Sequence, residues 1–375
     1  MLLRVLIVIG FAMCQPLAAN ADNPLDRLVS EITERDPGVP SVVAHARSPR
    51  HAIDWTGEAR GAGEVGPAPL AKRPFRIASV TKLFVAATVL RLAEQDRLVL
   101  HQGVSAYLSD GTTKMLLAGG YDPARITISE LLSHTSGLAD HSTIPAFEQS
   151  VLANGQRRWT RDEQIALAMS DSRKLGEPGE RWAYSDTGYL LLAEVIEQQT
   201  GEPLAAAIRN LLRFEELGLE ETWFETQEMP PRHLPARLTQ RIGKIDVTDF
   251  DPSFDLWGGG GIVSTVSDLA LFMSAFVKGQ FFDRPESLAL ALAKPKSTQA
   301  KGSAAHGLVF VEQVHAGHHC IGHAGFWNVD LVACPGLDLT VVVTLNQPAT
   351  VRPDERRRLV DAIVAEVDKA RERRP

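Results

Sequence analysis

Strand-like segments lie at the two ends of this sequence and are missing from its middle. Short apolar or alternating runs bounded by turn residues predict strands at residues 39–46 and 51–58. Similar runs near the other end predict four more strands, at residues 306–314, 317–323, 328–334 and 339–345. The simplest way to pair them is one antiparallel sheet built from both chain ends.

Helical patterns fill the rest of the chain. Residues 25–36 and 351–373 predict terminal helices that cover one face of the sheet, and the segment between the two strand groups is mainly helical. We therefore expect an α/β fold of the α+β kind, with a helical lobe inserted between two parts of a sheet domain. Residues 22–98 and 302–375 would form the sheet domain, and residues 99–301 the helical one.

The first 21 residues differ from the remainder. Arg4 precedes an apolar run at residues 5–13, and Ala19-Asn20-Ala21 is a small-x-small cleavage site. This pattern predicts a secretory signal at residues 1–21, and so a periplasmic or secreted protein. The alternative is an uncleaved anchor. No later segment is apolar enough to span a membrane.

Charge and cysteine content bear on the possible partners of the protein and on a possible disulfide. The formal net charge of −7 argues against nucleic acid as a partner. Cys320 and Cys334 are the cysteines that remain after the signal. In an oxidising compartment they could pair, or they could be small core residues, and sequence spacing does not decide between the two.

Ser79-Val80-Thr81-Lys82 opens an apolar run that predicts a buried helix. A spacing of three residues places Ser79 and Lys82 on one face of its first turn. A serine hydroxyl needs a neighbouring base to act as a nucleophile, and a desolvated lysine can serve. The pattern indicates an acyl-transfer site. The alternative is an ordinary helix cap at Ser79 with a solvated Lys82.

Tyr184-Ser185-Asp186 follows a turn-rich stretch. In an extended loop, residues two apart point the same way, so Tyr184 and Asp186 could face one cleft. A phenol beside a lysine can relay a proton. The alternative for Asp186 is a cap on the helix predicted at residues 188–199.

His323-Ala324-Gly325 ends a predicted strand, where a glycine allows a ligand to approach the backbone. The alternative is a surface histidine in a hairpin. His319 and His323 would lie about 13 Å apart along a strand, which is too far for one metal ion, so we expect no metal site. Gly258 to Gly261 lacks the residues of a nucleotide loop and predicts close chain packing.

These three motifs, in this order, resemble those of the penicillin-recognising serine hydrolases, most closely the branch of class C β-lactamases, D,D-peptidases and carboxylesterases. The stretch from Leu131 to Leu138, Leu-Leu-Ser-His-Thr-Ser-Gly-Leu, is a further marker of that family, and we interpret His134 as structural. The resemblance implies a β-lactamase-like fold and no cofactor. It assigns catalysis to Ser79, Lys82 and Tyr184, and substrate binding to Asp186, His323, Gly325 and Phe326. The backbone amides of Ser79 and Phe326 would form the oxyanion hole.

One departure from the family matters. The second motif usually ends in Asn, whereas here it ends in Asp186. An ionised aspartate can only accept hydrogen bonds, and it can keep Lys82 protonated. The sequence therefore predicts a secreted serine hydrolase of esters or D-amino-acid peptides, cell-wall peptide included. A class C-like β-lactamase and a non-catalytic penicillin-binding-like receptor are the alternatives.

Overall fold

The central sheet takes its strands from both ends of the chain. The computed structural model describes residues 23–171, 174–293 and 306–372. Its six antiparallel strands lie in the order β2-β1-β11-β10-β9-β8. They are β1 (Ser41–Ser48), β2 (Ile53–Arg60), β8 (Val311–His315), β9 (His318–Gly325), β10 (Val329–Cys334) and β11 (Leu339–Thr344). The two chain ends meet where β1 pairs with β11, and this confirms the predicted sheet.

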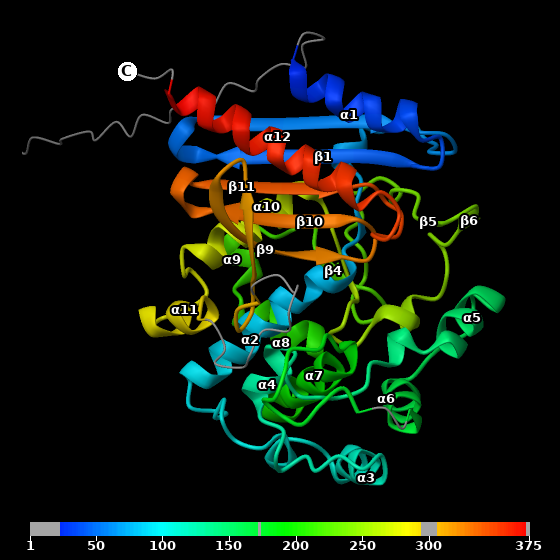
Figure 1. Cartoon of the computed structure of the whole chain (residues 1–375), viewed down its shortest axis with the longest axis vertical. Helices are drawn as coiled ribbons and strands as arrows, with labels where there is room; N and C mark the ends of the chain where they lie inside the picture. Colours follow the sequence, from blue (N-terminus) through cyan, green and yellow to red (C-terminus); the bar gives the residue numbers. More distant parts are fainter. Residues whose placement is uncertain (1–22, 172–173, 294–305, 373–375) are drawn as a thin grey trace, which may run out of the picture.

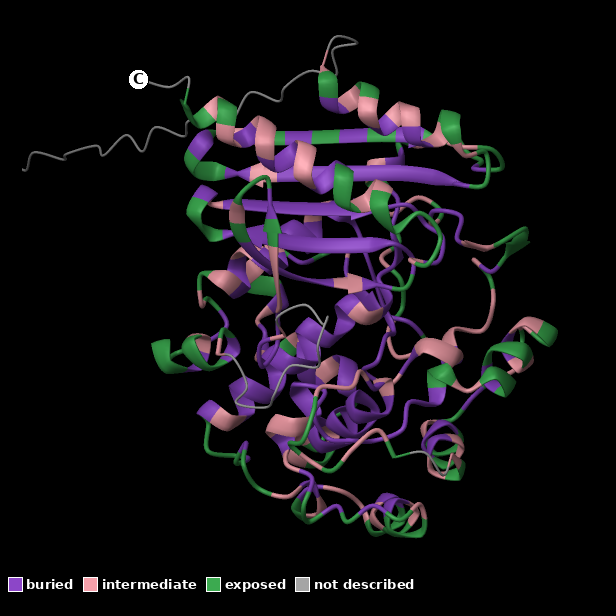
Figure 2. Ribbon diagram, viewed as in Figure 1, coloured by how far each residue is buried: buried purple, intermediate pink, exposed green. Residues whose placement is uncertain are grey.

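Helices cover both faces of this sheet. Helices α1 (Pro24–Arg35) and α12 (Pro353–Glu372) lie on one face, and α10 (Val266–Val277) packs on the other (Figure 1). Strands β1, β10 and β11 are buried along almost their whole length because both faces are covered, while the edge strand β2 alternates between buried and exposed residues (Figure 2). This layering fixes the register of the strands that lead to the site.

The helical lobe lies beyond the far edge of the sheet (Figure 1). Its long helices, α2 (Thr81–Glu94) and α7 (Asp186–Thr200), are apolar on nearly all sides and share one hydrophobic core with α10. The other helices are α3 (Asp110–Ala118), α4 (Ile128–Leu132), α5 (Pro145–Ala153), α6 (Arg161–Ser170), α8 (Leu204–Leu211), α9 (Phe214–Leu217) and α11 (Pro285–Ala291). The domain division at residues 98 and 302 stays a prediction, and residue 302 lies outside the described residues.

Short strands link the lobe to the sheet. Strand β7 (Ile262–Ser264) pairs with β3 (Phe75–Arg76) on one side and with β4 (Trp223–Phe224) on the other. A two-stranded ribbon of β5 (Arg241–Ile242) and β6 (Ile245–Asp246) lies apart from them. Because β3 directly precedes the Ser79 turn, its pairing with β7 fixes where that turn begins.

Two details differ from the sequence-based expectation or decide between its alternatives. The strand predicted at residues 306–314 begins only at Val311, because the amide of Gly307 donates to the carbonyl of Phe310 and closes a turn there. Cys320 on β9 and Cys334 on β10 are joined by a disulfide, so pairing is the alternative that holds.

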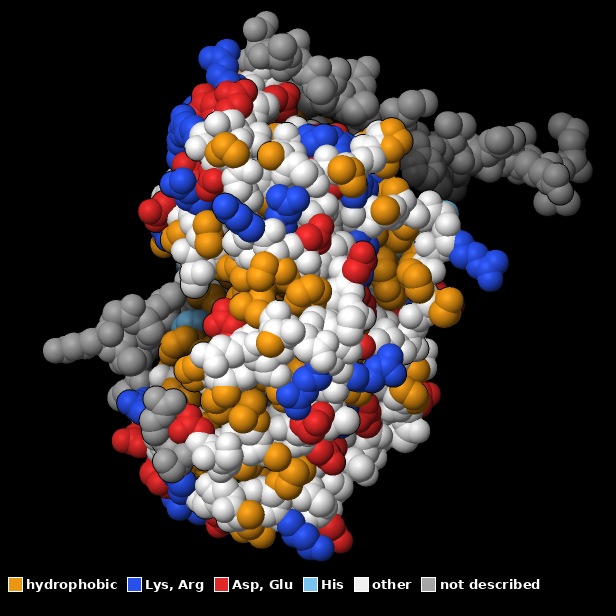
Figure 3. Space-filling view, turned by 90° about the vertical axis from the view of Figure 1, so that its right-hand side faces the viewer, with side chains coloured by type: hydrophobic (Ala, Val, Ile, Leu, Met, Phe, Trp, Pro, Cys, Tyr) orange, Lys and Arg blue, Asp and Glu red, His pale blue; other side chains and the backbone are white. Residues whose placement is uncertain are grey.

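None of the helices in the described ranges is both long and apolar enough to cross a bilayer. The signal predicted at residues 1–21 falls outside those ranges. On the face drawn in Figure 3, basic and acidic side chains are interspersed over the upper and lower parts, and hydrophobic side chains gather between them.

Candidate active site

Ser79 lies at the junction between the sheet and the lobe. It belongs to a 3₁₀ turn, Ala78–Val80, that runs directly into α2. The start of the turn is anchored to β7, because the amide of Ile77 donates to the carbonyl of Ile262, 3.1 Å away. Ala78 takes a left-handed conformation, with φ of 46°, which is uncommon for a residue with a side chain. Ser79 is half-buried, so its hydroxyl sits at the foot of α2 within reach of solvent.

Lys82 is fully buried in the first turn of α2. Its Nζ lies 2.9 Å from Ser79 Oγ and 2.6 Å from the carbonyl oxygen of Gly259. It also forms an ion pair with the carboxylate of Asp186. The spacing of three residues therefore does bring Ser79 and Lys82 into contact, and the lysine is not the solvated residue of the alternative interpretation.

The glycine stretch before β7 supplies one of these partners. Gly258 and Gly261 have φ values of 92° and 111°, which favour glycine, and the turn between them aims the Gly259 carbonyl at Lys82. A Cβ on Gly260 would lie 2.3 Å from the Asp255 carboxylate. The stretch packs closely, as predicted, but its role as an acceptor for Lys82 was not foreseen.

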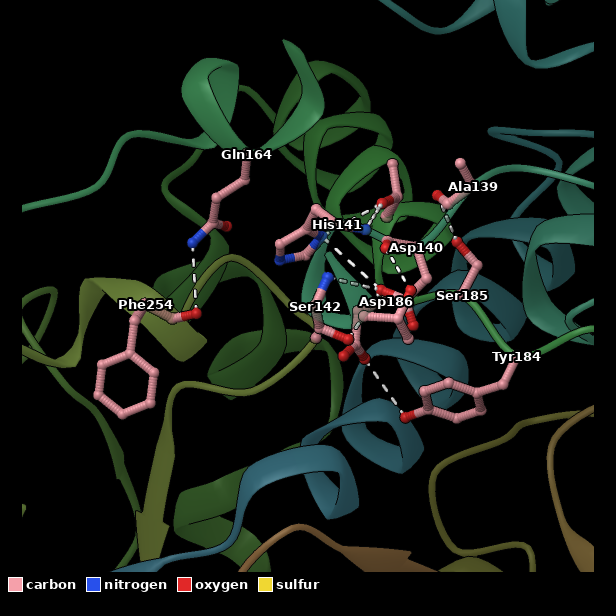
Figure 4. Close-up of polar contacts among 12 residues, drawn as sticks. Ala139, Asp140, His141, Ser142, Gln164, Tyr184, Ser185, Asp186 and Phe254 are labelled. Atoms are coloured by element: carbon pink, nitrogen blue, oxygen red, sulfur yellow. Dashed lines mark hydrogen bonds and ion pairs between the residues drawn. The ribbon is translucent and has the colours of Figure 1, made fainter. Parts of the chain in front are cut away.

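Tyr184 and Asp186 approach Ser79 from the start of α7. The Tyr184 hydroxyl lies 2.8 Å from Ser79 Oγ. It also lies 3.3 Å from Asp186 Oδ1 (Figure 4). Ser185 occupies the N-cap of α7 and Asp186 is its first helical residue, so the capping interpretation of Asp186 is wrong. Burial would raise the pKa of Asp186, but the Lys82 ammonium outweighs it and holds the pKa below its ordinary value. Burial, with the nearby Asp186 charge, raises the pKa of Tyr184 well above its ordinary value.

His134 holds the Tyr184 segment in place. Its ring stacks on that of Tyr184, with the ring centres 4.3 Å apart, and its Nδ1 accepts a 3.2 Å hydrogen bond from the amide of Ser185. Its own carbonyl accepts from the amide of Ala183 at 2.8 Å. Burial keeps the pKa of His134 well below its ordinary value, so the ring is neutral. These contacts support the structural interpretation of His134.

The end of β9 brings the third motif beside the Ser79 turn. A Cβ on Gly325 would lie 2.3 Å from the carbonyl oxygen of Ile77, so only glycine allows this approach. His323 is buried, and burial lowers its pKa to about 3. Its Nδ1 lies 2.7 Å from the carbonyl of Ala324, which makes Nδ1 the donor and leaves Nε2 as an acceptor. The side chain of Phe326 is 44% exposed.

Other titratable groups near Asp186 were missed by sequence reasoning. Burial, and next the charge of Asp186, raise the pKa of Asp140 to about 7, and its Oδ1 accepts from the amide and hydroxyl of Ser142 (Figure 4). Burial lowers the pKa of His141 to about 4, and the ring contacts Thr187 Oγ1 at 3.1 Å. Both residues follow the Leu131 to Leu138 marker, and that position is the signal that could have revealed them.

The histidines of β8 and β9 do not converge on a metal site. His315 contacts Asp361 and Gln313, each at 2.7 Å, and His318 contacts Asp368 at 3.0 Å. No cluster of three or more His, Cys, Asp or Glu side chains that could hold a metal ion occurs in the ranges the structure describes.

The sequence of this chain is similar to those of known proteins. A profile of the beta-lactamase family matches residues 25–366. Esterase EstB of Burkholderia gladioli is 32% identical over 310 residues, which are 75% of each chain. The D-alanyl-D-alanine-carboxypeptidase/endopeptidase AmpH of Escherichia coli K12 is 25% identical over 209 residues, which are 56% of this chain and 50% of AmpH.

Solved structures share the fold over almost the entire chain. A D-stereospecific amidohydrolase from Streptomyces sp. superposes with a TM-score of 0.72 at 25% identity, covering 87% of this chain and 95% of its own. The D-amino acid amidase of Ochrobactrum anthropi SV3, in its complex with L-phenylalanine amide, gives a TM-score of 0.75 at 22% identity, covering 93% of this chain and 100% of its own. The family profile, the relatives and the fold agree that this chain belongs to the beta-lactamase family.

Proposed function

We propose that the protein is a serine hydrolase that acts through an acyl-enzyme on Ser79. One observation carries the proposal: Ser79 Oγ lies 2.9 Å from Lys82 Nζ and 2.8 Å from the Tyr184 hydroxyl. A nucleophile in contact with two groups that bear exchangeable protons is the arrangement that acyl transfer needs. An ordinary capping serine would not be surrounded in this way.

The reaction has two halves. Ser79 Oγ attacks the acyl carbon, its proton passes to the neighbouring polar groups, and the leaving alkoxide or amine takes a proton as it departs. Water then attacks the acyl-enzyme and releases the acid. The backbone amides of Ser79 and Phe326 are the proposed oxyanion hole, and Gly325 supports it by bringing β9 against the Ser79 turn.

The substrates we favour are esters, followed by D-amino-acid peptides. Asp186 offers no N–H to a substrate amide carbonyl, and esters depend less on such help because their leaving group is better. His323, neutral and with Nε2 as an acceptor, suits a hydrogen-bond donor on the substrate. EstB and AmpH are named for esterase and D-alanyl-D-alanine-carboxypeptidase activities, which agrees with both candidate classes. A class C-like β-lactamase activity is the second candidate, supported by the family itself.

We also propose that the protein works outside the cytoplasm, in the periplasm or secreted, after removal of residues 1–21. Its partners would be small-molecule or short-peptide substrates, cell-wall peptide included. The apolar run and the Ala-Asn-Ala site support this location. N-terminal sequencing of exported protein should begin at or near Asp22, and retention of the first 21 residues would contradict the proposal.

Covalent labelling tests the proposed function. A fluorophosphonate should form an adduct on Ser79, located by peptide mass mapping, and Ser79→Ala should abolish both labelling and hydrolysis of p-nitrophenyl butyrate. Ser185→Ala is a matched control, since its hydroxyl donates to the carbonyl of Ala139 and does not touch Ser79. An adduct on a different serine, or none on folded protein, would overturn the assignment and favour a non-catalytic receptor.

A further inference from the structure

The polar contacts of Lys82 fit an ammonium group. A lysine ammonium has three N–H donors and no acceptor. Three acceptors surround Lys82 Nζ: the hydroxyl of Ser79, the carbonyl of Gly259 and the carboxylate of Asp186. An ammonium gives one N–H to each of these three partners, so the contacts fit the charged form with every donor satisfied.

The surroundings of Lys82 also favour the charged form. A carboxylate in direct contact stabilises an ammonium, even where burial opposes it. The Nζ further lies 5.2 Å from the ring centre of Tyr184 and 5.4 Å from that of Tyr189, distances at which aromatic rings attract cations. A resting ammonium cannot be the group that accepts the proton of Ser79.

Tyr184 provides another route for that proton. Its hydroxyl has one hydrogen and two close oxygens, Ser79 Oγ at 2.8 Å and Asp186 Oδ1 at 3.3 Å. Tyr184 donates to Ser79 Oγ at rest. Because the Asp186 carboxylate can only accept, turning the phenol hydrogen toward Oδ1 leaves the Tyr184 oxygen as an acceptor for the Ser79 hydroxyl. Ser79 then accepts from Lys82, and all three side chains are satisfied.

We propose that Asp186 is the terminal proton acceptor of a Ser79–Tyr184–Asp186 relay, with Lys82 acting as a fixed positive charge. This rests on the proposed function and assigns its general base. As the bond from Ser79 Oγ to the acyl carbon forms, the serine proton moves to the Tyr184 oxygen and the phenol proton moves to Asp186 Oδ1. When the ester C–O bond breaks, the Tyr184 proton passes to the leaving alkoxide and the proton on Asp186 Oδ1 returns to the Tyr184 oxygen, so the alcohol departs neutral and Asp186 is ionised again.

The relay accounts for the replacement of Asn by Asp in the second motif. Asparagine cannot accept the phenol proton as an ionised carboxylate does. A carboxylate that is held ionised by an ammonium is a weak base, and esters need less help than amides because an alkoxide is the better leaving group. The relay therefore points to esters as the preferred substrates of this same site.

The decisive experiment is Asp186→Asn, measured with p-nitrophenyl butyrate across pH. If Asp186 accepts the proton, kcat/KM at neutral pH should fall by about 100-fold, the usual scale for a lost general base. The acid limb should also move to higher pH, because only Lys82, freed of its anion, could then serve as the base. If Lys82 is the base in the natural protein, the substitution should instead leave kcat/KM unchanged or raise it, and that outcome overturns the relay.

Controls separate a relay from a loss of structure or of charge. Asp140→Asn, compared above pH 8 where a carboxyl with a pKa of about 7 is ionised, removes a neighbouring charge that bonds to Ser142 and not to Tyr184, so kcat/KM should stay within about threefold of the natural protein. Asp186→Glu should keep part of the activity and the natural position of the acid limb. A 100-fold loss in Asp140→Asn as well would show a general charge effect and would contradict the relay.

A second measurement does not depend on a variant. Two protons move together in the relay, so the rate of acylation of the natural protein in mixtures of H₂O and D₂O should depend on the D₂O fraction along a curve. A straight line would mean one moving proton and would overturn the relay. Hydrolysis that survives Ser79→Ala would instead overturn the proposed function, so the two failures are distinguishable.

Discussion

Two buried ion clusters lie close together in this chain, and they are built from different chemical groups. One joins Lys82 to Asp186 beside Ser79. The other joins Arg76 to Glu225, with Nε of the arginine 2.6 Å from the carboxylate. Both cations are buried, and Arg76 precedes Ser79 by only three residues.

The clusters differ in whether their protons can move. The guanidinium of Arg76 bonds to Glu225 through Nε and Nη2, and it also donates to the carbonyls of Val247 and Phe250 at 3.0 and 2.7 Å. Arg237 pairs with the same glutamate. Arginine does not release a proton in proteins, so this cluster can only hold loops together. Lys82, Asp186 and Tyr184 can all exchange protons, and they surround a half-exposed hydroxyl. Burial is common to both clusters, while proton mobility distinguishes them.

Removing a group from the Lys82 cluster should give the largest effect, and it should act on catalysis. Lys82→Ala and Tyr184→Phe should each lower kcat for p-nitrophenyl butyrate by a factor of about 10²–10⁴, because each loses a group that stabilises or moves the serine proton. The midpoint of urea unfolding for Tyr184→Phe should change far less than that of a core variant. Turnover near the natural value in either protein would show that the cluster is merely structural.

Breaking the Arg76 cluster should have the opposite consequence. Glu225→Gln leaves two arginines without their shared anion and should lower the free energy of unfolding by about 3–5 kcal/mol. The kcat of the molecules that remain folded should stay within about threefold of the natural protein. Because Arg76 lies so near Ser79, this is a stringent comparison. A large fall in kcat with unchanged unfolding would place Glu225 in the catalytic machinery.

The sequence predicted which side chains of the site come together but not how they are bonded. Ser79 and Lys82 lie on one helix turn, so their contact follows from local geometry. Tyr184 reaches Ser79 and Lys82 because α2 and α7 pack together through apolar side chains. The family resemblance indicates that these three residues share one site. The start of β8 was misjudged, because a turn at Gly307 cannot be distinguished from a strand by hydrophobic pattern alone.

The sequence alone does not predict the contacts that backbone carbonyls make in the site. The carbonyl of Gly259 points at Lys82 only because the flanking glycines adopt positive φ, and that choice depends on the final packing. The tautomer of His323 is likewise set by the carbonyl of Ala324. Such contacts decide protonation states, and therefore roles, that a motif leaves open.

The disulfide offers a third kind of stabilisation, one that needs no charge at all. Cys320 and Cys334 are 14 residues apart, and a closed loop of about that length stabilises a fold by about 3 kcal/mol. Replacing both with serine should lower the free energy of unfolding by this amount in urea titrations. Reducing agent should destabilise the natural protein but not the variant. Equal sensitivity of the two to reductant would show that the link contributes nothing.

The smallest effect we predict concerns a group that the site keeps uncharged. Folding holds His323 neutral, with its pKa lowered from an ordinary 6.5 to about 3 by burial and then by the Lys82 charge. Below pH 6.5 the unfolded chain is protonated at this residue, whereas the folded protein is protonated there only below about pH 3. His323 therefore favours unfolding progressively as the pH falls through that window. This proton uptake by the unfolded chain alone is the source of the pH dependence.

His323→Gln removes the difference in proton binding between the folded and unfolded chain. From pH 7.5 to 5.0 the natural protein should lose about 2 kcal/mol of unfolding free energy relative to the variant. The comparison uses the difference between the two proteins because Asp140 and Asp255, whose pKa values burial raises to about 7, respond to acid in the opposite direction. Urea titrations at both pH values measure it, and curves that stay parallel would mean that His323 takes up its proton equally in the folded and unfolded chain.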